Sequence, residues 1–293
     1  MKELVIISGK GGTGKTSLTA SFACLAHNAI IIDADVDAAD LHLILKPEIL
    51  KQEEFSGGSK ANIDKNVCTK CGACIEVCNF DAVTDDFVID AVECEGCKLC
   101  FEFCPENAVK FSRQICGEWY ISDSRAGTMI HAKLGIAQEN SGMLVSLLRR
   151  EAQKAARQKG IPLIITDGPP GTGCPVIASV TGADAVLIIT EPTLSGMHDM
   201  KRVKELTDLL KIPAMFCINK YDINTEITEE IQEFGSEHGL KFLGNIPYDS
   251  DLTKAMLAQK SLVEFSDNDT AKAVKDIWKN AGNFLAGLKD RLM

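Results

Sequence analysis

Eight cysteines between residues 68 and 104 are the part of this sequence whose spacing points most directly to chemistry. They form two runs with the same spacing, Cys-x2-Cys-x2-Cys-x3-Cys. Three thiolates this close together reach three irons of one cubane, and the fourth cysteine of each run typically binds the other cluster. The spacing therefore predicts two [4Fe–4S] clusters with crossed ligands. The first would use Cys68, Cys71, Cys74 and Cys104, and the second Cys94, Cys97, Cys100 and Cys78.

The two runs belong to an internal repeat of 26 residues, which indicates a duplicated metal-binding unit. Outside the cysteines, Ile63-Asp64 recurs as Ile89-Asp90, and Ala82-Val83 recurs as Ala108-Val109. The alternative is zinc, which zinc ribbons bind through paired Cys-x2-Cys units. Such four-coordinate sites have no use for a third closely spaced thiolate, so the spacing favours iron–sulfur clusters.

The whole cysteine segment resembles a bacterial two-cluster ferredoxin. It departs from that pattern at Asn79, where a proline is expected after the first run, whereas Pro105 follows the second run. Residues 62–112 carry ten Asp or Glu and four Lys, a net charge of −6. This negative charge would attract a basic redox partner. The alternative is that the acidic residues only form the solvated surface of a small domain.

A phosphate-binding motif stands near the N-terminus. It reads Gly9-Lys10-Gly11-Gly12-Thr13-Gly14-Lys15-Thr16 and is followed by Ser17, which we also expect to bind nucleotide. The motif follows an apolar run and opens a helical segment, the context that a nucleotide-binding loop requires. Its backbone N–H groups would surround the phosphates, aided by the positive end of the helix. We expect Lys15 to bind the β- and γ-phosphates and Thr16 to ligate Mg²⁺.

Lys10 is a second lysine early in this loop, as in the "deviant" form of the motif. The chain therefore resembles the MinD/ParA and nitrogenase iron protein family of dimeric ATPases, over residues 1–50 and about 115–265. The resemblance implies a homodimer in which Lys10 reaches across to the nucleotide of the partner subunit.

Carboxylates follow two predicted strands and would face the phosphate loop. Asp33-Ala34-Asp35-Val36-Asp37 resembles the first switch of the family, and Asp167-Gly168-Pro169-Pro170-Gly171 resembles the second. The resemblance implies that Asp37 orients the attacking water and helps hold hydrated Mg²⁺, with Asp167 on the water shell of the metal. Magnesium prefers oxygen ligands and keeps several waters, which suits this arrangement. Together with the two loop lysines, Asp37 and Asp167 are the predicted catalytic residues.

A motif for the nucleotide base follows a later strand. Asn219-Lys220-Tyr221-Asp222 matches the guanine-reading pattern of GTPases, in which the aspartate binds guanine. In the resembled family the asparagine reads adenine instead, and Pro247-Tyr248 lies on the other side of the base. The resemblance favours ATP, but the motif by itself leaves GTP open.

Alternating strands and helices would position these motifs. Near-continuous apolar runs predict buried parallel strands, and helical segments lie between them. The strands are expected at 4–8, 29–33, 162–167, 185–190, 214–219 and 241–246, and the helices at 15–27, 141–159, 195–210 and 226–238. This order predicts an α/β, doubly wound, mainly parallel sheet of the P-loop type, formed by residues 1–55 and 113–293. Residues 56–112 would be an inserted α+β, bacterial-ferredoxin-like domain, which Ser56-Gly57-Gly58-Ser59 joins as a linker.

Composition limits the class of protein. The chain has 293 residues, twelve cysteines and a net charge of −10, which argues against a general nucleic-acid binder. The N-terminal apolar run is too short for a signal peptide, and no run approaches the ~20 residues of a membrane span. We therefore expect a cytoplasmic protein with reduced thiols.

The basic, amphipathic stretch 271–292 leaves membrane association open, although a helix packed on the sheet explains the same pattern. Cys24, Cys174 and Cys217 are expected to be buried thiols.

Taken together, the motifs predict an ATP-hydrolysing iron–sulfur protein with ATP, Mg²⁺ and two [4Fe–4S] clusters as cofactors. The favoured function couples nucleotide state to electron transfer, or to iron–sulfur or metal-cofactor handling by a protein partner. The main alternative is a MinD-like positioning or scaffold ATPase with redox-sensing or structural clusters. The least favoured alternative is an ATP-dependent amidoligase similar to cobyrinate diamide synthase. It ranks last because such an enzyme needs a source of ammonia, which this sequence does not include.

Overall fold

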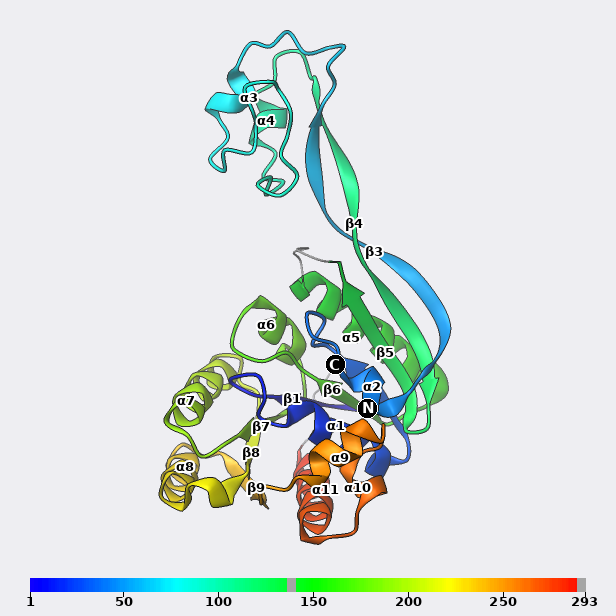
Figure 1. Cartoon of the computed structure of the whole chain (residues 1–293), viewed down its shortest axis with the longest axis vertical. Coiled ribbons are helices and arrows are strands. Elements are labelled where there is room, and N and C mark those ends of the chain that lie inside the picture. The colour runs from blue at the N-terminus through cyan, green and yellow to red at the C-terminus, as the bar shows by residue number, and fades with distance from the viewer. Residues whose placement is uncertain (136–140, 289–293) are drawn as a thin grey trace. The chain divides into compact units, whose positions relative to one another are not determined.

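The computed structural model describes residues 1–135 and 141–288, which divide into two compact units (Figure 1). The first, called here the nucleotide unit, comprises Met1–Glu53, Glu118–Leu134 and Ser141–Met293. The second, called the cysteine unit, comprises Glu54–Gly117 and a short stretch that begins at Gly135.

Among the described residues, nine strands form one sheet in the order β3-β4-β5-β2-β6-β1-β7-β8-β9. The six predicted strands are confirmed, and they lie side by side as parallel neighbours at the β2-to-β9 end of this order. Their bounds are β1 Lys2–Ile7, β2 Ala29–Asp33, β6 Leu163–Asp167, β7 Ala185–Thr190, β8 Ala214–Asn219 and β9 Lys241–Ile246. The parallel α/β fold of the P-loop type is therefore confirmed.

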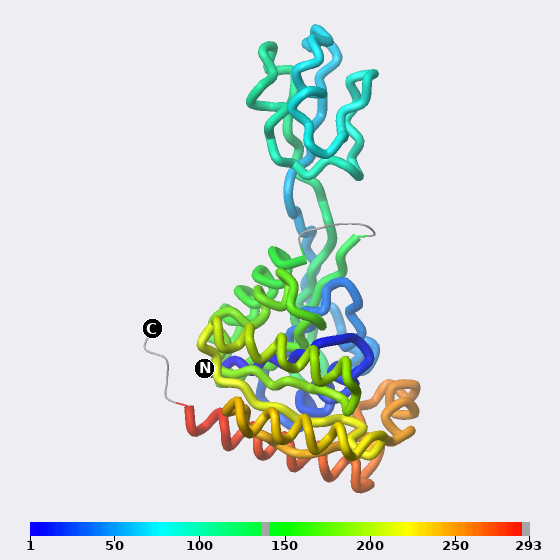
Figure 2. Tube along the Cα trace, turned by 90° about the vertical axis from the view of Figure 1, so that its left-hand side faces the viewer, coloured from blue at the N-terminus to red at the C-terminus, as the bar shows by residue number. Residues whose placement is uncertain are grey.

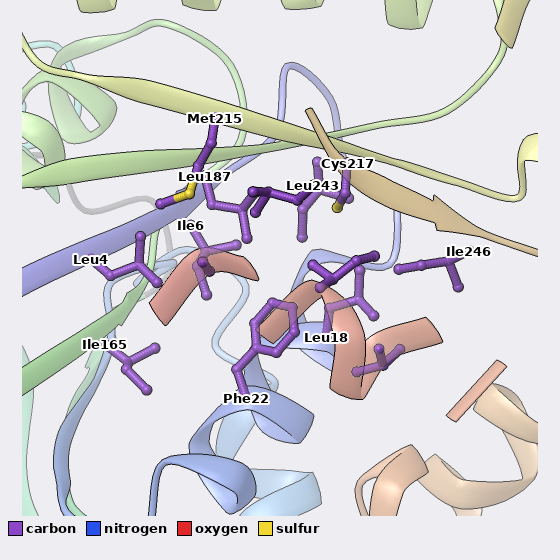
Figure 3. Close-up of a cluster of buried hydrophobic side chains, with 14 of the residues drawn as sticks. Leu4, Ile6, Leu18, Phe22, Ile165, Leu187, Met215, Cys217, Leu243 and Ile246 are labelled. Carbon is purple, nitrogen blue, oxygen red and sulfur yellow. The ribbon is translucent and has the colours of Figure 1, made fainter. Parts of the chain in front are cut away.

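Helices cover both faces of this sheet. Successive residues of a strand point to opposite faces, so Leu4 and Ile6 pack with α1 and α11, whereas Val5 and Ile7 pack with α6 and α7. Figure 3 shows Phe22 and Leu18 of α1 lying among the side chains of the first of these clusters. The long helices are α1 Lys15–Ala26, α5 Ser141–Lys159, α7 Leu194–Leu209, α8 Thr225–Glu237 and α11 Asp269–Gly287. The shorter ones are α2 Leu41–Leu45, α6 Cys174–Val180, η1 Tyr221–Ile223, α9 Asp251–Leu257 and α10 Leu262–Phe265.

Helix α11, red in Figure 2, packs on β9 and α1. Its buried residues include Val274, Ile277 and Ala281, which belong to the same core cluster as Phe22. The apolar face of the predicted stretch 271–292 therefore covers the sheet as far as the structure describes it; residues 289–292 lie outside the described part.

Three strands were not predicted. They are β3 Glu48–Ile63, β4 Val109–Ser124 and β5 Gly127–Leu134, and β5 continues the sheet as a parallel neighbour of β2. The predicted linker Ser56–Ser59 is extended rather than irregular, because these residues lie inside β3. Ser and Gly favour turns, but here the neighbouring strand β4 supplies the pairing that keeps the segment extended. The chain passes between its two units along β3 and β4.

The cysteine unit is small, and its only described helices are α3 Ala73–Glu76 and α4 Leu99–Glu102. Each carries the third cysteine of its run, Cys74 or Cys100. The backbone repeats with the sequence: Gly72 and Lys98, which are 26 residues apart, both precede their helix with a left-handed φ, of 86° and 70°. This agreement in backbone conformation supports the duplication inferred from the sequence.

Candidate functional site

The phosphate loop connects β1 to α1, as predicted. Gly14 has a φ of 87°, and a Cβ there would lie 2.4 Å from Nδ2 of Asn219, so only glycine fits. Above the loop is a cavity of about 510 Å³. It is lined by the loop from Gly11 to Ser17, the acidic residues Asp35, Asp37 and Asp40, and Pro169, Pro170, Pro175 and Met256. The structure therefore brings the loop and both predicted switches to one cavity.

Asp167 is the centre of a buried polar network beneath this cavity. It accepts hydrogen bonds from Lys15 Nζ at 3.0 Å and from Thr16 Oγ1 at 2.8 Å. Thr19 Oγ1, which sequence reasoning missed, donates to the same carboxylate at 2.9 Å. Burial by itself would lower the pKa of Lys15, but the negative charges of Asp167 and Asp35 outweigh it and raise that pKa. Lys15 is therefore held as a cation beside the two groups expected to bind Mg²⁺.

The carboxylates of the first switch differ in environment. Asp33 is fully buried and faces Asp167 across the β2–β6 pairing. Burial, and then the charge of Asp167, raise its pKa well above the ordinary value. Asp33 accepts a hydrogen bond from the backbone of Leu41 at 3.1 Å, which fixes the start of α2. Asp37 is exposed and lines the cavity, where a water-orienting residue would have to lie.

A second cavity of about 240 Å³ adjoins the loop and contains most of the predicted base-binding residues. Asn219, Lys220, Pro247 and Tyr248 line it, together with Leu252, Thr253 and Met256, which sequence reasoning missed. Asn219 Nδ2 donates to the carbonyl of Thr13 at 2.8 Å, so this side chain also fixes the phosphate loop.

Asp222 is not among the residues that line this cavity. Its carboxylate instead accepts a hydrogen bond from the backbone N–H of Tyr248 at 2.7 Å. The residue that would read guanine in a GTPase therefore holds the opposite wall of the base pocket in place. This contact supports the choice of ATP over GTP.

Lys10 does not point into the cavity. Its Nζ lies 2.5 Å from Oε1 of Glu191 and donates to Ser195 Oγ at 3.0 Å. Glu191 directly follows β7, and nothing in the sequence motifs singled it out. In this arrangement Lys10 is bound within its own chain, at the beginning of α7.

The cysteines gather at two separate pockets in the cysteine unit. Cys68, Cys71, Cys74 and Cys104 line one of them, and Cys78, Cys94, Cys97 and Cys100 line the other. Each pocket thus has three cysteines of one run and the last cysteine of the other run. Within the described ranges, no three or more His, Cys, Asp or Glu side chains form a group arranged to hold a single metal ion.

In each run, a backbone N–H group donates to the last cysteine, the one that lines the pocket of the other run. Ala82 N donates to Cys78 Sγ and Ala108 N to Cys104 Sγ, both at 3.3 Å, in matching positions of the repeat. Burial would raise the pKa of Cys104, but hydrogen bonds from the backbone of residues 106–109, that of Ala108 first among them, outweigh it and lower that pKa. A donor set of four thiols with N–H groups directed at sulfur fits an iron–sulfur cluster, whose cysteines bind as thiolates.

The remaining cysteines have different surroundings. Cys217 is buried in the core, as predicted, and Cys24 is partly buried. Cys174 is exposed at the start of α6, so the prediction of a buried thiol there is wrong. The burial of the second switch ends before the helix begins: Pro169 is buried, whereas Gly173 and Cys174 are exposed, a change that the apolar neighbours in the sequence did not reveal. Cys116 is buried and donates to the carbonyl of Gly57 at 2.8 Å.

The family model of the CobQ/CobB/MinD/ParA nucleotide binding domain matches residues 4–263. The chain belongs to this family. As a member of the MinD/ParA type it is a P-loop ATPase. An uncharacterized protein of Methanocaldococcus jannaschii is 31% identical to it over 97% of both chains. An iron-sulfur cluster carrier protein of Pyrococcus abyssi is 24% identical over 98% of this chain and 88% of its own length.

The fold is also similar to that of solved structures. The septum site-determining protein MinD of Pyrococcus horikoshii, solved in complex with Mg-ADP, has a TM-score of 0.60 and 17% identity. The match covers 99% of each chain. At this level of identity the likeness concerns the fold. Among helices of the described residues, none is long and apolar enough to cross a membrane.

Proposed function

We propose that this ATPase couples its nucleotide state to two [4Fe–4S] clusters bound in residues 56–112. The observation that carries the proposal is the grouping of the eight cysteines into two pockets of four with crossed membership. One cluster would be held by Cys68, Cys71, Cys74 and Cys104, and the other by Cys78, Cys94, Cys97 and Cys100. The clusters would supply one-electron chemistry, or iron and sulfide for a metal-cofactor-maturation partner.

The nucleotide site supports the roles proposed for its residues. The loop N–H groups and Lys15 would bind the phosphates of ATP. Thr16 and Asp167, whose oxygens lie 2.8 Å apart, would hold Mg²⁺ and its water shell. Asp37, exposed at the cavity, would orient the attacking water. Such positioning and charge neutralisation are the main work of a protein in phosphoryl transfer.

A homodimer with ATP between its subunits would complete the site. Lys10 would then leave Glu191 and contact the nucleotide of the partner subunit. Hydrolysis removes the γ-phosphate and so releases the switches. The first switch ends at Asp37, and only α2 separates it from β3, along which the chain enters the cysteine unit. A switch that moves with nucleotide would therefore be connected covalently to the cluster-binding residues.

The proposal is tested on the anaerobically purified chain. We expect close to eight irons and eight acid-labile sulfides per chain by metal and sulfide analysis. Stoichiometric zinc without labile sulfide would contradict the cluster assignment. If the iron is present but its redox behaviour is independent of nucleotide, the scaffold ATPase becomes the better account.

Lys10→Ala tests the dimer separately. It should abolish ATP-dependent dimerisation and hydrolysis, while Lys15 and the loop backbone keep ATP affinity within about threefold of wild type. Analytical ultracentrifugation and a fluorescent-nucleotide titration measure the two effects. Normal dimerisation and turnover of this variant would show that Lys10 does not act on the partner subunit.

A further inference from the structure

Glu191 lies between two lysines that come from different nucleotide motifs. Its Oε1 is 2.5 Å from Nζ of Lys10, and its Oε2 is 3.2 Å from Nζ of Lys220. Lys10 belongs to the phosphate loop and Lys220 to the base motif. One carboxylate thus pairs with both cations.

The surroundings of Lys10 show why this carboxylate is needed. Besides Glu191, its Nζ donates to Ser195 Oγ at 3.0 Å and to Thr193 Oγ1 at 3.4 Å. Thr193 is the N-cap of α7, whose first turn carries partial positive charge. A cation is unfavourable at that end of a helix, and the two hydroxyls are neutral. Glu191 is therefore the only one of these three contacts that supplies negative charge.

The carboxylate and its backbone are held firmly. The side chain of Glu191 is only 14% exposed, against 33% for Lys10. Burial would raise the pKa of Glu191, but its hydrogen bonds with Lys10 and Lys220 outweigh it and lower that pKa. Its backbone carbonyl packs against Gly196, where a Cβ would come within 2.3 Å. An ionised, backbone-fixed carboxylate restrains the lysine that contacts it.

We propose that Glu191 is a positioning residue that keeps Lys10 within its own chain until nucleotide is bound. This inference rests on the role proposed above for Lys10. Release of Lys10 leaves the charge of Glu191 paired with Lys220, whose Nζ also donates to the carbonyl of Gly12 at 3.2 Å. The cost of breaking the Lys10–Glu191 pair then sets the ATP concentration at which the dimer forms.

The direct test is the reactivity of the Lys10 amine in the nucleotide-free, iron-loaded chain. Brief acetylation followed by peptide mass spectrometry measures its labelling rate relative to the other lysines. Glu191→Gln keeps the shape but removes the charge, and it should raise the labelling rate of Lys10 roughly fivefold, the upper range for a partly exposed ion pair. Ser195→Ala removes only a hydroxyl acceptor of Lys10 and should raise the rate less.

Glu205→Gln is the matched control. It removes one negative charge at an exposed position of α7, the helix that follows Glu191, so the net charge of the protein changes by the same amount. We expect no change in Lys10 labelling. An equal rate in wild type and Glu191→Gln, with unchanged circular dichroism, would overturn the proposal. Equal acceleration in the Glu205→Gln control would also overturn it, because the effect would then be one of overall charge.

The ATP concentration for half-maximal dimerisation provides the second measurement. In Glu191→Gln it should fall roughly fivefold, with a lower KM and a smaller change in kcat. Faster labelling without any change in dimerisation would support the restraint by Glu191 while contradicting the role of Lys10 in the partner subunit. The two proposals can therefore fail separately.

Discussion

The nucleotide unit and the cysteine unit are stabilised by different means. The nucleotide unit has two extensive apolar clusters, one on each face of its sheet. In the cysteine unit, the buried cluster consists of Ala61, Ile63, Val83 and Val109 with Cys74 and Cys100, and four further cysteines pack against it. A unit this small, with so few buried aliphatic side chains, needs a metal or disulfides to remain folded. Six of the eight proposed cluster ligands therefore either belong to this buried cluster or pack against it.

The two sites also differ in how far they are formed before their ligands bind. In the nucleotide unit, Lys15, Thr16 and Asp167 are fixed by hydrogen bonds to one another and by a core that does not involve the nucleotide. In the cysteine unit, binding and folding would be coupled, because cysteines bind metal as thiolates and the unfolded chain has no preformed site. The fold of the nucleotide site should therefore survive loss of the clusters, whereas the fold of the cysteine unit should not.

Removal of iron should produce the largest effect. Chelation under anaerobic conditions should reduce amide hydrogen-exchange protection in residues 62–112 by at least about 100-fold, because the remaining apolar cluster is too small. Protection in β1 and β7, which lie in the apolar core of the nucleotide unit, should stay unchanged. Retained protection of residues 62–112 in the iron-free chain would show that the cysteine unit folds without metal.

A matched pair of variants tests the crossed cysteine pockets. Cys104→Ser should halve the iron content and remove the cluster whose other ligands belong to the first run. Cys78→Ser should remove the other cluster instead. Electron paramagnetic resonance distinguishes the two, since each variant retains a different signal. Loss of the same signal in both variants would contradict the crossed arrangement.

A smaller effect is expected at two glycines of the repeat. A Cβ at Gly96 would lie 2.4 Å from the carbonyl of Ser59 in β3, whereas a Cβ at Gly72 would meet nothing within 4 Å. Both have a left-handed φ, of 64° and 86°, so alanine costs about 1–2 kcal/mol at either position. Gly96→Ala must in addition displace β3 and should accelerate iron release more than Gly72→Ala. Equal rates of release would show that the contact with β3 does not support the cluster loop.

The sequence predicted the nucleotide unit well because its signals are local. Buried parallel strands such as Leu163–Asp167 are continuous apolar runs, and the phosphate loop has a fixed spacing of glycines and lysines. The cysteine pockets were likewise predicted from spacing. In contrast, β3 was missed because Ser56-Gly57-Gly58-Ser59 has turn propensity, and only pairing with a strand more than 50 residues away keeps it extended.

Side-chain contacts between segments distant in the sequence could not be predicted either. Glu191 has no motif of its own, and its importance comes from two lysines that the fold brings to it from residues 10 and 220. Asp222 matched a guanine-reading pattern, yet the fold turns its carboxylate to the backbone of Tyr248. Both cases depend on side-chain directions at strand ends, which a pattern of residue types does not specify.

If nucleotide state and cluster state are coupled, the reduction potential of the clusters must depend on the bound nucleotide. Potentials should be measured by anaerobic redox titration of the full chain with ADP and with a non-hydrolysable ATP analogue. We expect a shift of tens of millivolts between the two, where roughly 60 mV corresponds to a tenfold change for one electron. Reduction should then change nucleotide affinity by the matching factor, because coupling is reciprocal. Identical potentials in both nucleotide states, with an affinity that does not depend on reduction, would contradict the account.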